Sequence, residues 1–278
     1  MDTRFIQTLL AVVDAGSFAA AARLQNLTPA AVAQRVKALE AELNRALIVR
    51  AGQRVAPTQA CLSILPRLGD IVSQVRQIAA DLDTSGLGGP IRIGAISTAL
   101  SDRVPNVLRQ FAKRAPTAKI IVMPGTSKDL YAMLLAGEID AAFVVQPPFN
   151  MPKSVSCVPI EAQPMVVIVS SEDRRSLEVI IADERVLIYD ATSWGGKIAA
   201  SWIAARIPRD RILCELDALE AIAIAVGHGV GFSIVPDWHG LTALASVRRI
   251  PLPELSETRH TVLLHRGLTQ ESLQLLCA

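Results

Sequence analysis

Basic side chains are concentrated near the start of the chain, where their density favours binding to a polyanion. Residues 1–62 contain seven Lys and Arg against four Asp and Glu, a net charge of +3, whereas the other residues together carry −1. Most of the positive charges lie between Arg23 and Arg54. A basic patch on a nearly neutral chain is typical of a nucleic-acid-binding segment. A solvated helix face would give the same charge, so the charge alone leaves both interpretations open.

Cysteines and histidines show no spacing that favours metal binding or nucleophilic catalysis. The four cysteines (Cys61, Cys157, Cys214 and Cys277) form no CxxC pair, and the four histidines form no HExxH motif. Isolated thiols of this kind are most often buried or half-buried side chains, with a redox pair in space as the alternative. Because the sequence also has no GxSxG motif and no Walker loop, we expect no catalytic residue, no metal and no cofactor.

Length and composition indicate a globular protein of about two domains. The chain has 278 residues, of which 51% are hydrophobic and 19% charged, which excludes intrinsic disorder. No apolar run reaches the roughly 18 residues of a membrane-spanning helix. Asp2, Arg4 and Asp14 are incompatible with a secretory signal. We therefore expect a cytoplasmic protein that does not contact a membrane.

The elements that would position the basic residues are three short helices. Residues 3–15 and 18–25 are the first two, with Gly16 suited to end one and Ser17 to cap the other. Thr28 and Pro29 are a strong start signal for the third. Apolar residues at helical spacing follow at Val32, Val36, Leu39 and Leu43. Two helices joined by a short turn predict a helix-turn-helix, whose second helix enters the major groove of DNA.

The third helix would present its polar face to the bases. Gln34 can bond an adenine, Lys37 can reach a guanine or a phosphate, and the small Ala30 and Ala33 let the backbone approach. Residues 47–50 and 55–56 predict a hairpin, a wing with two arginines at its tip that lies against phosphates. The complete predicted DNA-binding set is Ser17, Thr28, Pro29, Ala30, Ala33, Gln34, Arg35, Lys37, Arg50 and Arg54.

A long helix is predicted from Thr58 to about Asp83. Its apolar residues recur at heptad a/d spacing, at Leu65, Leu68, Val72, Val75, Ala79 and Leu82. Such a short stripe fits a dimerisation face or an intramolecular core face equally well. The following segment, residues 84–90, contains three glycines and a proline and predicts a hinge.

Strand and helix patterns alternate in the rest of the chain. Predicted strands at 91–95, 119–123 and 141–145 are separated by helices at about 102–114, with Pro105 in its first turn, and 128–136. A second such unit covers 165–235, and a short helix lies near 271–276. Alternation of this kind favours a parallel sheet with crossover helices, in two α/β halves that enclose a ligand cleft.

Adjacent hydroxyls stand where strands end and helices begin. Ser97 and Thr98 follow the first strand, Thr126 and Ser127 follow the second, and Ser193 with Trp194 lies in a loop of the other half. Hydroxyls at helix N-termini suit an anion such as a carboxylate, without a formal counter-ion. The alternative interpretation is that these hydroxyls only cap helices.

Sequence motifs resemble the LysR-type transcriptional regulators over nearly the whole chain. The N-terminal motifs are Gly16-Ser17-Phe18, Ala21-Ala22-x-Leu24, Thr28, Ala31-Val32, Gln34-Arg35-Val36-Lys37, Leu39-Glu40-x-x-Leu43, Leu47-Ile48-x-Arg50 and Thr58-x-Ala60. The later ones are Val104-Pro105-x-x-Leu108-x-x-Phe111, Leu134-x-x-Gly137-Glu138-x-Asp140 and Val226-Gly227-x-Gly229-x-Gly231-x-x-Ile234-x-Pro236. The chain departs from the family at Ala33, Ile48 and Cys61, where Ser, Phe and Gly are usual. Loss of the serine removes a hydrogen bond to DNA and is expected to alter sequence preference.

The resemblance implies an α/β protein with an N-terminal winged helix-turn-helix at 1–58. A linker and dimerisation helix at 59–84, a hinge at 85–89 and a periplasmic-binding-protein-like effector domain at 90–278 would follow. Subdomain I would cover about 90–160 plus 267–278, and subdomain II about 161–266. The implied partners are a palindromic double-stranded DNA site, a small-molecule effector in the cleft, the transcription machinery, and further copies in a homodimer or homotetramer.

We therefore expect a sequence-specific regulator modulated by a small anionic effector, with no enzymatic activity. The alternatives are a regulator whose cleft is vestigial and a small-molecule enzyme built on the α/β domain. A transport protein with the same two-lobed fold would carry a signal peptide and no DNA-binding head.

Overall fold

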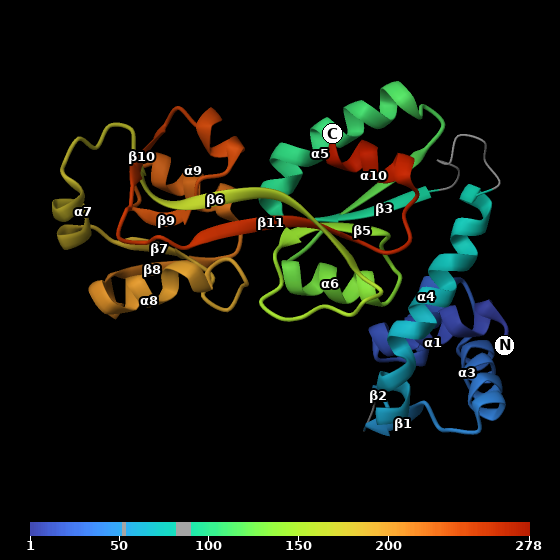
Figure 1. The fold of residues 1–278 in the computed structure, drawn as a ribbon. Coiled ribbons are helices and arrows are strands. Elements are labelled where there is room, and N and C mark those ends of the chain that lie inside the picture. The colour runs from blue at the N-terminus through green and yellow to red at the C-terminus, as the bar shows by residue number, and fades with distance from the viewer. Residues whose placement is uncertain (52–53, 82–89) are drawn as a thin grey trace. The chain divides into compact units, whose positions relative to one another are not determined.

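A computed structural model of the chain describes residues 1–51, 54–81 and 90–278 (Figure 1). Two compact units are present, Met1–Gly89 with Ala132–Asp140, and Pro90–Tyr131 with Ala141–Ala278. Within the described ranges no helix is both long enough and apolar enough to cross a bilayer.

The first unit contains a helix-turn-helix followed by a hairpin and a long helix. Its elements are α1 (Thr3–Ala15), α2 (Phe18–Gln25), α3 (Pro29–Leu43), β1 (Ile48–Ala51), β2 (Arg54–Pro57) and α4 (Gln59–Asp81). The predicted caps are present: Gly16 ends α1 with φ 59°, and the Thr28 hydroxyl accepts from Ala31 N at 3.2 Å. Thr58 caps α4 in the same way, accepting from Cys61 N at 3.1 Å.

The core of this unit is built from the apolar stripes of its helices. Leu9 of α1 and Leu39 of α3 have no exposed surface, and Val36 is only 1% exposed. Since these residues recur at the spacing of one helical face, burial of that face fixes which side of each helix remains exposed.

The remaining elements alternate between strands and helices. In chain order they are β3 (Pro90–Ala95), α5 (Ser97–Arg114), β4 (Lys119–Pro124), α6 (Ser127–Leu135), β5 (Ala141–Val145), β6 (Ser156–Ser170), α7 (Leu177–Asp183), β7 (Val186–Tyr189), α8 (Lys197–Arg206), η1 (Arg209–Arg211), β8 (Ile212–Leu216), α9 (Leu219–Gly227), β9 (Ser233–Pro236), η2 (His239–Ala243), β10 (Val247–Pro251), β11 (Thr258–His265) and α10 (Gln270–Cys277).

The large sheet is mixed, which corrects the expectation of a parallel sheet. Its order is β10-β6-β11-β5-β3-β4, with β9 also paired to β6. Strand β3 runs parallel to β4 and β5, but β11 runs antiparallel to both β5 and β6. The prediction missed β11 and the first half of β6, in which polar residues interrupt the apolar ones: β11 begins Thr258-Arg259-His260-Thr261 before its apolar run.

Strands β6 and β11 run side by side through the second unit and connect its two halves (Figure 1). On one side of them, β3, β4 and β5 carry α5 on one face and α6 on the other (Figure 1). On the other side, β7 pairs in parallel with β8, and α8 and α9 lie on opposite faces (Figure 1). The C-terminal helix α10 packs against α5. The ligand cleft is predicted between the two halves, at the carboxyl ends of these parallel strands.

Helix α5 begins five residues earlier than predicted. It starts at Ser97, directly after β3, so Pro105 lies in the helix interior and not in its first turn. Burial of Thr98, Ala99 and Val104 against the sheet continues the helix across the position where the sequence indicated its start.

All four cysteines are free thiols. Cys61 is buried in the core of the first unit, Cys214 is half-buried, and Cys157 and Cys277 are exposed. Burial, reinforced by the charge of Glu40, raises the pKa of the Cys61 thiol to about 11.

Candidate functional sites

The exposed face of α3 carries the residues predicted to meet base edges. Ala30, Gln34 and Lys37 are exposed, whereas Val32 and Val36 on the opposite face are at most 1% exposed. Because the inner face is anchored in the core, the outer residues are held on a rigid support. An amide and an ammonium group one helical turn apart are suited to adjacent bases in the major groove.

The start of α3 is open to a partner. Thr28 and Pro29 are exposed, and Ser17 and Ala33 are half-buried. The Ser17 hydroxyl caps α2 by accepting from Ala20 N at 3.4 Å. A helix N-terminus of this kind favours a phosphate group.

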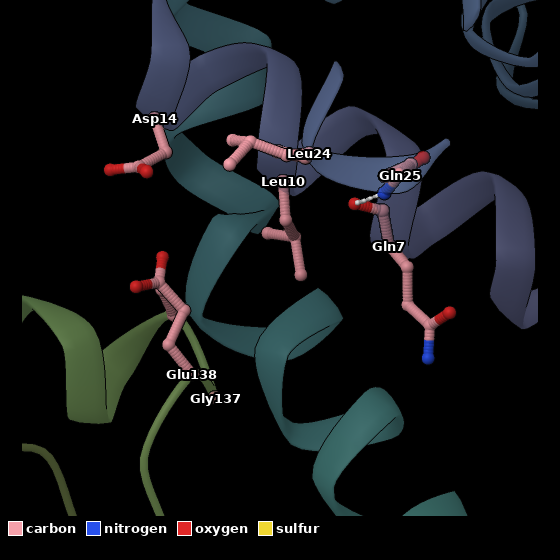
Figure 2. Close-up of a pocket in the computed structure, with 9 residues that line it drawn as sticks. Gln7, Leu10, Asp14, Leu24, Gln25, Gly137 and Glu138 are labelled. Carbon is pink, nitrogen blue, oxygen red and sulfur yellow. Dashed lines mark hydrogen bonds between the residues drawn. The ribbon is translucent and has the colours of Figure 1, made fainter. Parts of the chain in front are cut away.

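Arg35 belongs to a polar network that holds the helices together. Its Nη1 donates to the hydroxyl of Thr8 at 3.3 Å, and that hydroxyl lies 2.9 Å from Gln25 Oε1. Gln25 Nε2 in turn donates to the carbonyl oxygen of Gln7 at 3.1 Å (Figure 2). Thr8 is fully buried and Arg35 half-buried, so this guanidinium also fixes the packing of α3 against α1. No periodic pattern in the sequence marked Thr8 or Gln25 as members of this network.

The wing is attached to the helices by backbone hydrogen bonds. Glu40 Oε1 accepts from Leu47 N at 2.7 Å and from Ile48 N at 3.1 Å, and Val55 N donates to the Gly16 carbonyl at 3.0 Å. Strands β1 and β2 pair antiparallel, with Arg50 opposite Val55. The structure does not describe the side chains of Arg50 and Arg54, so their contact with phosphates stays a prediction.

The apolar stripe of α4 divides into two parts, which corrects the predicted dimerisation face. Leu68 and Val72 are 3% and 1% exposed and belong to the core of the same chain, with Leu65 packed against them. Of the two interpretations of this stripe, the core face therefore applies to these three residues. Val75 is 44% exposed and remains available to a second copy. The side chain of Ala79 and the whole of Leu82 lie outside the described part.

The cleft in the second unit contains a buried cation that the sequence analysis missed. Arg259 of β11 is 1% exposed, and its guanidinium donates to Gln163 Oε1 at 2.8 Å and to the hydroxyl of Thr98 at 3.1 Å. Thr98 lies in the first turn of α5, where no side chain caps the helix. The predicted hydroxyl site is thus backed by a formal positive charge. No sequence signal marked it, because the neighbours of Arg259 along the strand are the polar residues Thr258, His260 and Thr261.

Tyr189 closes one side of Arg259. The tyrosine ends β7 and is 6% exposed, and burial raises the pKa of its hydroxyl. A side chain at Gly195 would lie 2.7 Å from the Tyr189 hydroxyl and 3.0 Å from Arg259 Cδ. Glycine there therefore allows the loop after β7 to pass directly over both residues.

Three of the predicted effector residues have hydroxyls committed within the fold. Thr126 accepts from Asp129 N at 3.2 Å and donates to its carboxylate at 2.7 Å, which caps α6. Ser127 accepts from Val145 N at 3.1 Å and fixes the end of β5. Ser193 donates to the Asp190 carbonyl at 2.7 Å and accepts from Gly196 N at 3.0 Å. For Thr126 the capping interpretation describes the structure. The hydroxyl of Ser97 is half-buried and has no hydrogen-bond partner among the described residues.

Carboxylates gather near the second group of predicted residues. Asp217, after β8, is half-buried, and burial raises its pKa. The charges of Asp190 and Asp129 raise this pKa further, whereas the charge of Arg259 lowers it.

Comparison with protein families places both parts of the chain in one family. Residues 3–62 match the bacterial regulatory helix-turn-helix protein, lysR family, and residues 84–276 match the LysR substrate binding domain. The chain belongs to the LysR family. It is a DNA-binding transcriptional regulator with an effector-binding domain.

Relatives of this LysR-family regulator align along most of their length. The HTH-type transcriptional regulator SoxR from Arthrobacter sp. is 25% identical over 97% of this chain and 92% of its own. YofA from Bacillus velezensis is 25% identical over 85% of this chain and 81% of its own. These relatives are transcriptional regulators by name, and the family binds DNA and small-molecule effectors as oligomers.

Solved LysR-family structures share the fold. Full-length LysG from Corynebacterium glutamicum with bound effector Arg has a TM-score of 0.65 at 22% identity, covering 99% of this chain and 95% of its own. ArgP from Mycobacterium tuberculosis has a TM-score of 0.68 at 17% identity, covering 100% and 96%. At these identities the likeness concerns the fold alone.

Proposed function

We propose that this LysR-family regulator reads a palindromic DNA site with the outer face of α3 and that a small anionic effector in the cleft changes its activity. The exposed triad of Ala30, Gln34 and Lys37 on a helix whose other face is buried carries the first part. Two copies paired through their linker helices would present two such helices, in a homodimer or in a homotetramer. The protein would act in the cytoplasm, where it would bind chromosomal DNA and contact the transcription machinery, and it would work by binding and not by catalysis.

Each predicted DNA contact has a proposed task. Gln34 and Lys37 read base edges, and Ala30 and Ala33 allow the close approach. Ser17, Thr28 and Pro29 place helix N-termini near phosphates, and Arg35, Arg50 and Arg54 add positive charge at the backbone of the duplex.

The proposal of an anionic effector rests on the buried positive charge of Arg259. Arg259 stands behind Thr98 at the uncapped start of α5, and the two are hydrogen-bonded at 3.1 Å. A carboxylate at Ser97 and Thr98 would receive helix amides, hydroxyls and the field of the guanidinium. The proposed boundaries of this domain remain 90–278, after a winged helix at 1–58, a linker helix at 59–84 and a hinge at 85–89.

The double variant Gln34→Ala with Lys37→Ala tests the recognition helix. The DNA is a duplex that the wild-type protein selects from a random library, and binding is measured by fluorescence anisotropy. Loss of two base contacts should weaken specific binding by about 100-fold. Lys37→Ala alone should lower the salt slope of binding by about one if it contacts a phosphate.

A matched control removes the same chemical groups elsewhere. Gln274 on α10 and Lys113 on α5 are both exposed, so Gln274→Ala with Lys113→Ala should leave specific binding unchanged. Equal affinities for the two double variants would contradict the assignment of α3.

A further inference from the structure

The chain passes between the two halves of the second unit in strands β6 and β11. The first half contains β3, β4, β5, α5 and α6, and the second half contains β7, β8, α8 and α9 (Figure 1). Residues of β6 up to Pro164 pair with β11, and those from Met165 onward pair with β9 and β10. The pairing of β6 with β11 changes register between Thr261 and Val262. Because a register shift of this kind bends the strands, these two strands can act as a hinge between the halves.

Three aromatic rings from opposite halves meet beside this hinge. Tyr131 of α6 and Phe149 in the loop after β5 belong to the first half, and Trp194 in the loop after β7 belongs to the second. The ring centroid of Trp194 lies 5.9 Å from that of Tyr131 and 5.6 Å from that of Phe149. The centroids of Tyr131 and Phe149 are 5.4 Å apart. Interplanar angles of 63° to 86° make all three contacts edge-to-face, an arrangement in which aromatic rings attract one another.

The loop that carries Trp194 is fixed to the second half by hydrogen bonds. The hydroxyl of Ser193 donates to the carbonyl oxygen of Asp190 at 2.7 Å. The backbone nitrogen of Ala191 donates to Oε1 of Glu215, which lies on β8, at 2.8 Å. Trp194 therefore moves with the second half when the hinge bends, and its ring leaves the two rings of the first half.

Arg259 lies between the two halves and is only 1% exposed. Its guanidinium donates to the hydroxyl of Thr98, in the first half, at 3.1 Å. Gly195, the residue after Trp194, covers it from the second half, since a Cβ at Gly195 would lie 3.0 Å from Cδ of Arg259. Movement of the Trp194 loop away from α5 therefore uncovers this guanidinium.

We propose that Tyr131, Phe149 and Trp194 form an aromatic latch, which holds the two halves closed over Arg259. Opening of the hinge separates Trp194 from the other two rings, so the ring contacts favour the closed arrangement. The ring of Phe149 is 47% exposed, so this contact can break without unfolding either half. The latch determines how often the groups between the halves can be reached from solvent. This inference goes beyond the proposed function and does not depend on which molecule the protein binds.

A second contact between the halves is weaker than the latch. Helix α5 contacts α9, and the hydroxyl of Ser101 on α5 donates to Oε1 of Glu220 on α9 at 3.0 Å. Ser101 is exposed, so water competes for this hydrogen bond and it adds little to the closed arrangement. Loss of the rings should therefore open the hinge more than loss of the Ser101 hydroxyl.

Modification of Arg259 by phenylglyoxal tests the latch on the full-length protein. The reagent reacts with accessible guanidinium groups, and mass spectrometry of proteolytic peptides gives the initial rate at each arginine. Phe149→Leu removes two ring contacts and should speed the modification of Arg259 about tenfold, because the open fraction rises. Trp194→Leu should act similarly, whereas Trp194→Phe keeps a ring and should have a smaller effect.

Controls separate opening of the latch from general loosening of the fold. Arg114, at the end of α5, is exposed and should react at the same rate in every variant. Arg266, which follows β11, is 4% exposed and should remain slow unless the domain unfolds. Phe5→Leu removes a half-buried ring from the first unit and should leave the rate at Arg259 unchanged.

Several results would overturn the latch. One is an unchanged rate at Arg259 in Phe149→Leu; because Phe149 is exposed in a loop, this variant decides even if Trp194→Leu fails to fold. Another is an equal acceleration at Arg259 and Arg266, which would mean that the rings only stabilise the fold. An acceleration by Ser101→Ala as large as that by Phe149→Leu would show that the rings have no special role.

Discussion

The two units use polar side chains in opposite ways. On α3 the polar groups that we propose to read DNA, Gln34 and Lys37, are exposed on the face opposite the apolar core. In the α/β unit the corresponding groups, Thr98, Gln163 and Arg259, are at most 3% exposed and hydrogen-bonded to one another. A DNA duplex is too large to enter a protein, whereas a small effector gains most from charges that are shielded from water.

That difference has a thermodynamic consequence. An exposed residue such as Lys37 can be removed with little effect on folding, because water replaces its interactions. A buried group such as Thr98 cannot, since its removal leaves the guanidinium of Arg259 with one acceptor fewer. Variants on the exposed face of α3 should therefore lose function without losing stability. Variants of the buried groups around Arg259 should lose both together.

The largest effect is expected for a core residue of the first unit. Leu9 has no exposed surface, so Leu9→Ala should lower the free energy of unfolding by about 2–5 kcal/mol and abolish specific DNA binding. All three tryptophans lie in the second unit, so the circular dichroism transition in urea should shift while the tryptophan fluorescence transition does not. Leu24→Ala, at a residue that is 69% exposed, is the control and should stay within about 0.5 kcal/mol. Equal shifts of both transitions would show that the units do not unfold separately.

A second variant tests whether the buried hydrogen bond between Thr98 and Arg259 contributes to stability. Thr98→Val keeps the shape of the side chain but removes the hydroxyl that accepts from Arg259, which should cost about 1–3 kcal/mol of stability. The tryptophan fluorescence transition in urea measures this change. Thr242→Val removes an exposed hydroxyl of η2 and should be nearly neutral. A neutral Thr98→Val would show that the buried network contributes no more than a surface hydroxyl.

A smaller loss of stability is expected when a helix cap is removed from either unit. Thr28 caps α3 and Thr126 caps α6, so Thr28→Ala and Thr126→Ala should each lower the unfolding free energy by about 1 kcal/mol. Circular dichroism in urea follows the first change, and tryptophan fluorescence follows the second. If Thr126→Ala weakened ligand binding without changing stability, Thr126 would be a ligand contact and not a cap.

The smallest expected effect is the pH dependence of the stability of the second unit. His265 is 8% exposed, and its Nδ1 has no hydrogen-bond partner among the residues that the structure describes. Burial lowers the pKa of its imidazole below the ordinary value. The unfolded chain then binds a proton that the folded chain does not, and stability should fall as the pH drops below about 6.5. Urea midpoints at several pH values should show a shallower slope for His265→Gln than for the wild type. The exposed control His228→Gln should keep the wild-type slope, and an equal slope in all three proteins would exclude His265 as the cause.

Sequence periodicity was sufficient for the helices of the first unit. Helices α1 and α2 were predicted with both ends, and α3 with its start, because each carries its own cap at Gly16, Ser17 or Thr28 and an apolar stripe. The stripe of α4 was also detected, but its two interpretations could not be separated. Burial of Leu68 and Val72 by the same chain depends on how α4 crosses α1, which the spacing does not specify.

Prediction was weaker in the second unit, where long-range pairing decides the structure. Strand β11 and the first half of β6 were missed, and with them the side chains that these strands bring to the cleft. Pro105 suggested a helix start because a proline is tolerated in the first turn. In the structure α5 extends through it, because packing of the earlier turn against the sheet outweighs the lost hydrogen bond.

The sequence by itself determined the class of protein, the helix-turn-helix and the hydroxyls at the start of α5. These follow from interactions between residues that are close along the chain, such as caps, helical stripes and turns. Only the tertiary structure placed Arg259 beside Thr98, 161 residues away, and beside Gln163, 96 residues away. The same holds for the ring contacts among Tyr131, Phe149 and Trp194, which come from three separate segments. The charge of the cleft is therefore a property of the folded chain, because local sequence patterns do not specify which distant strands become neighbours.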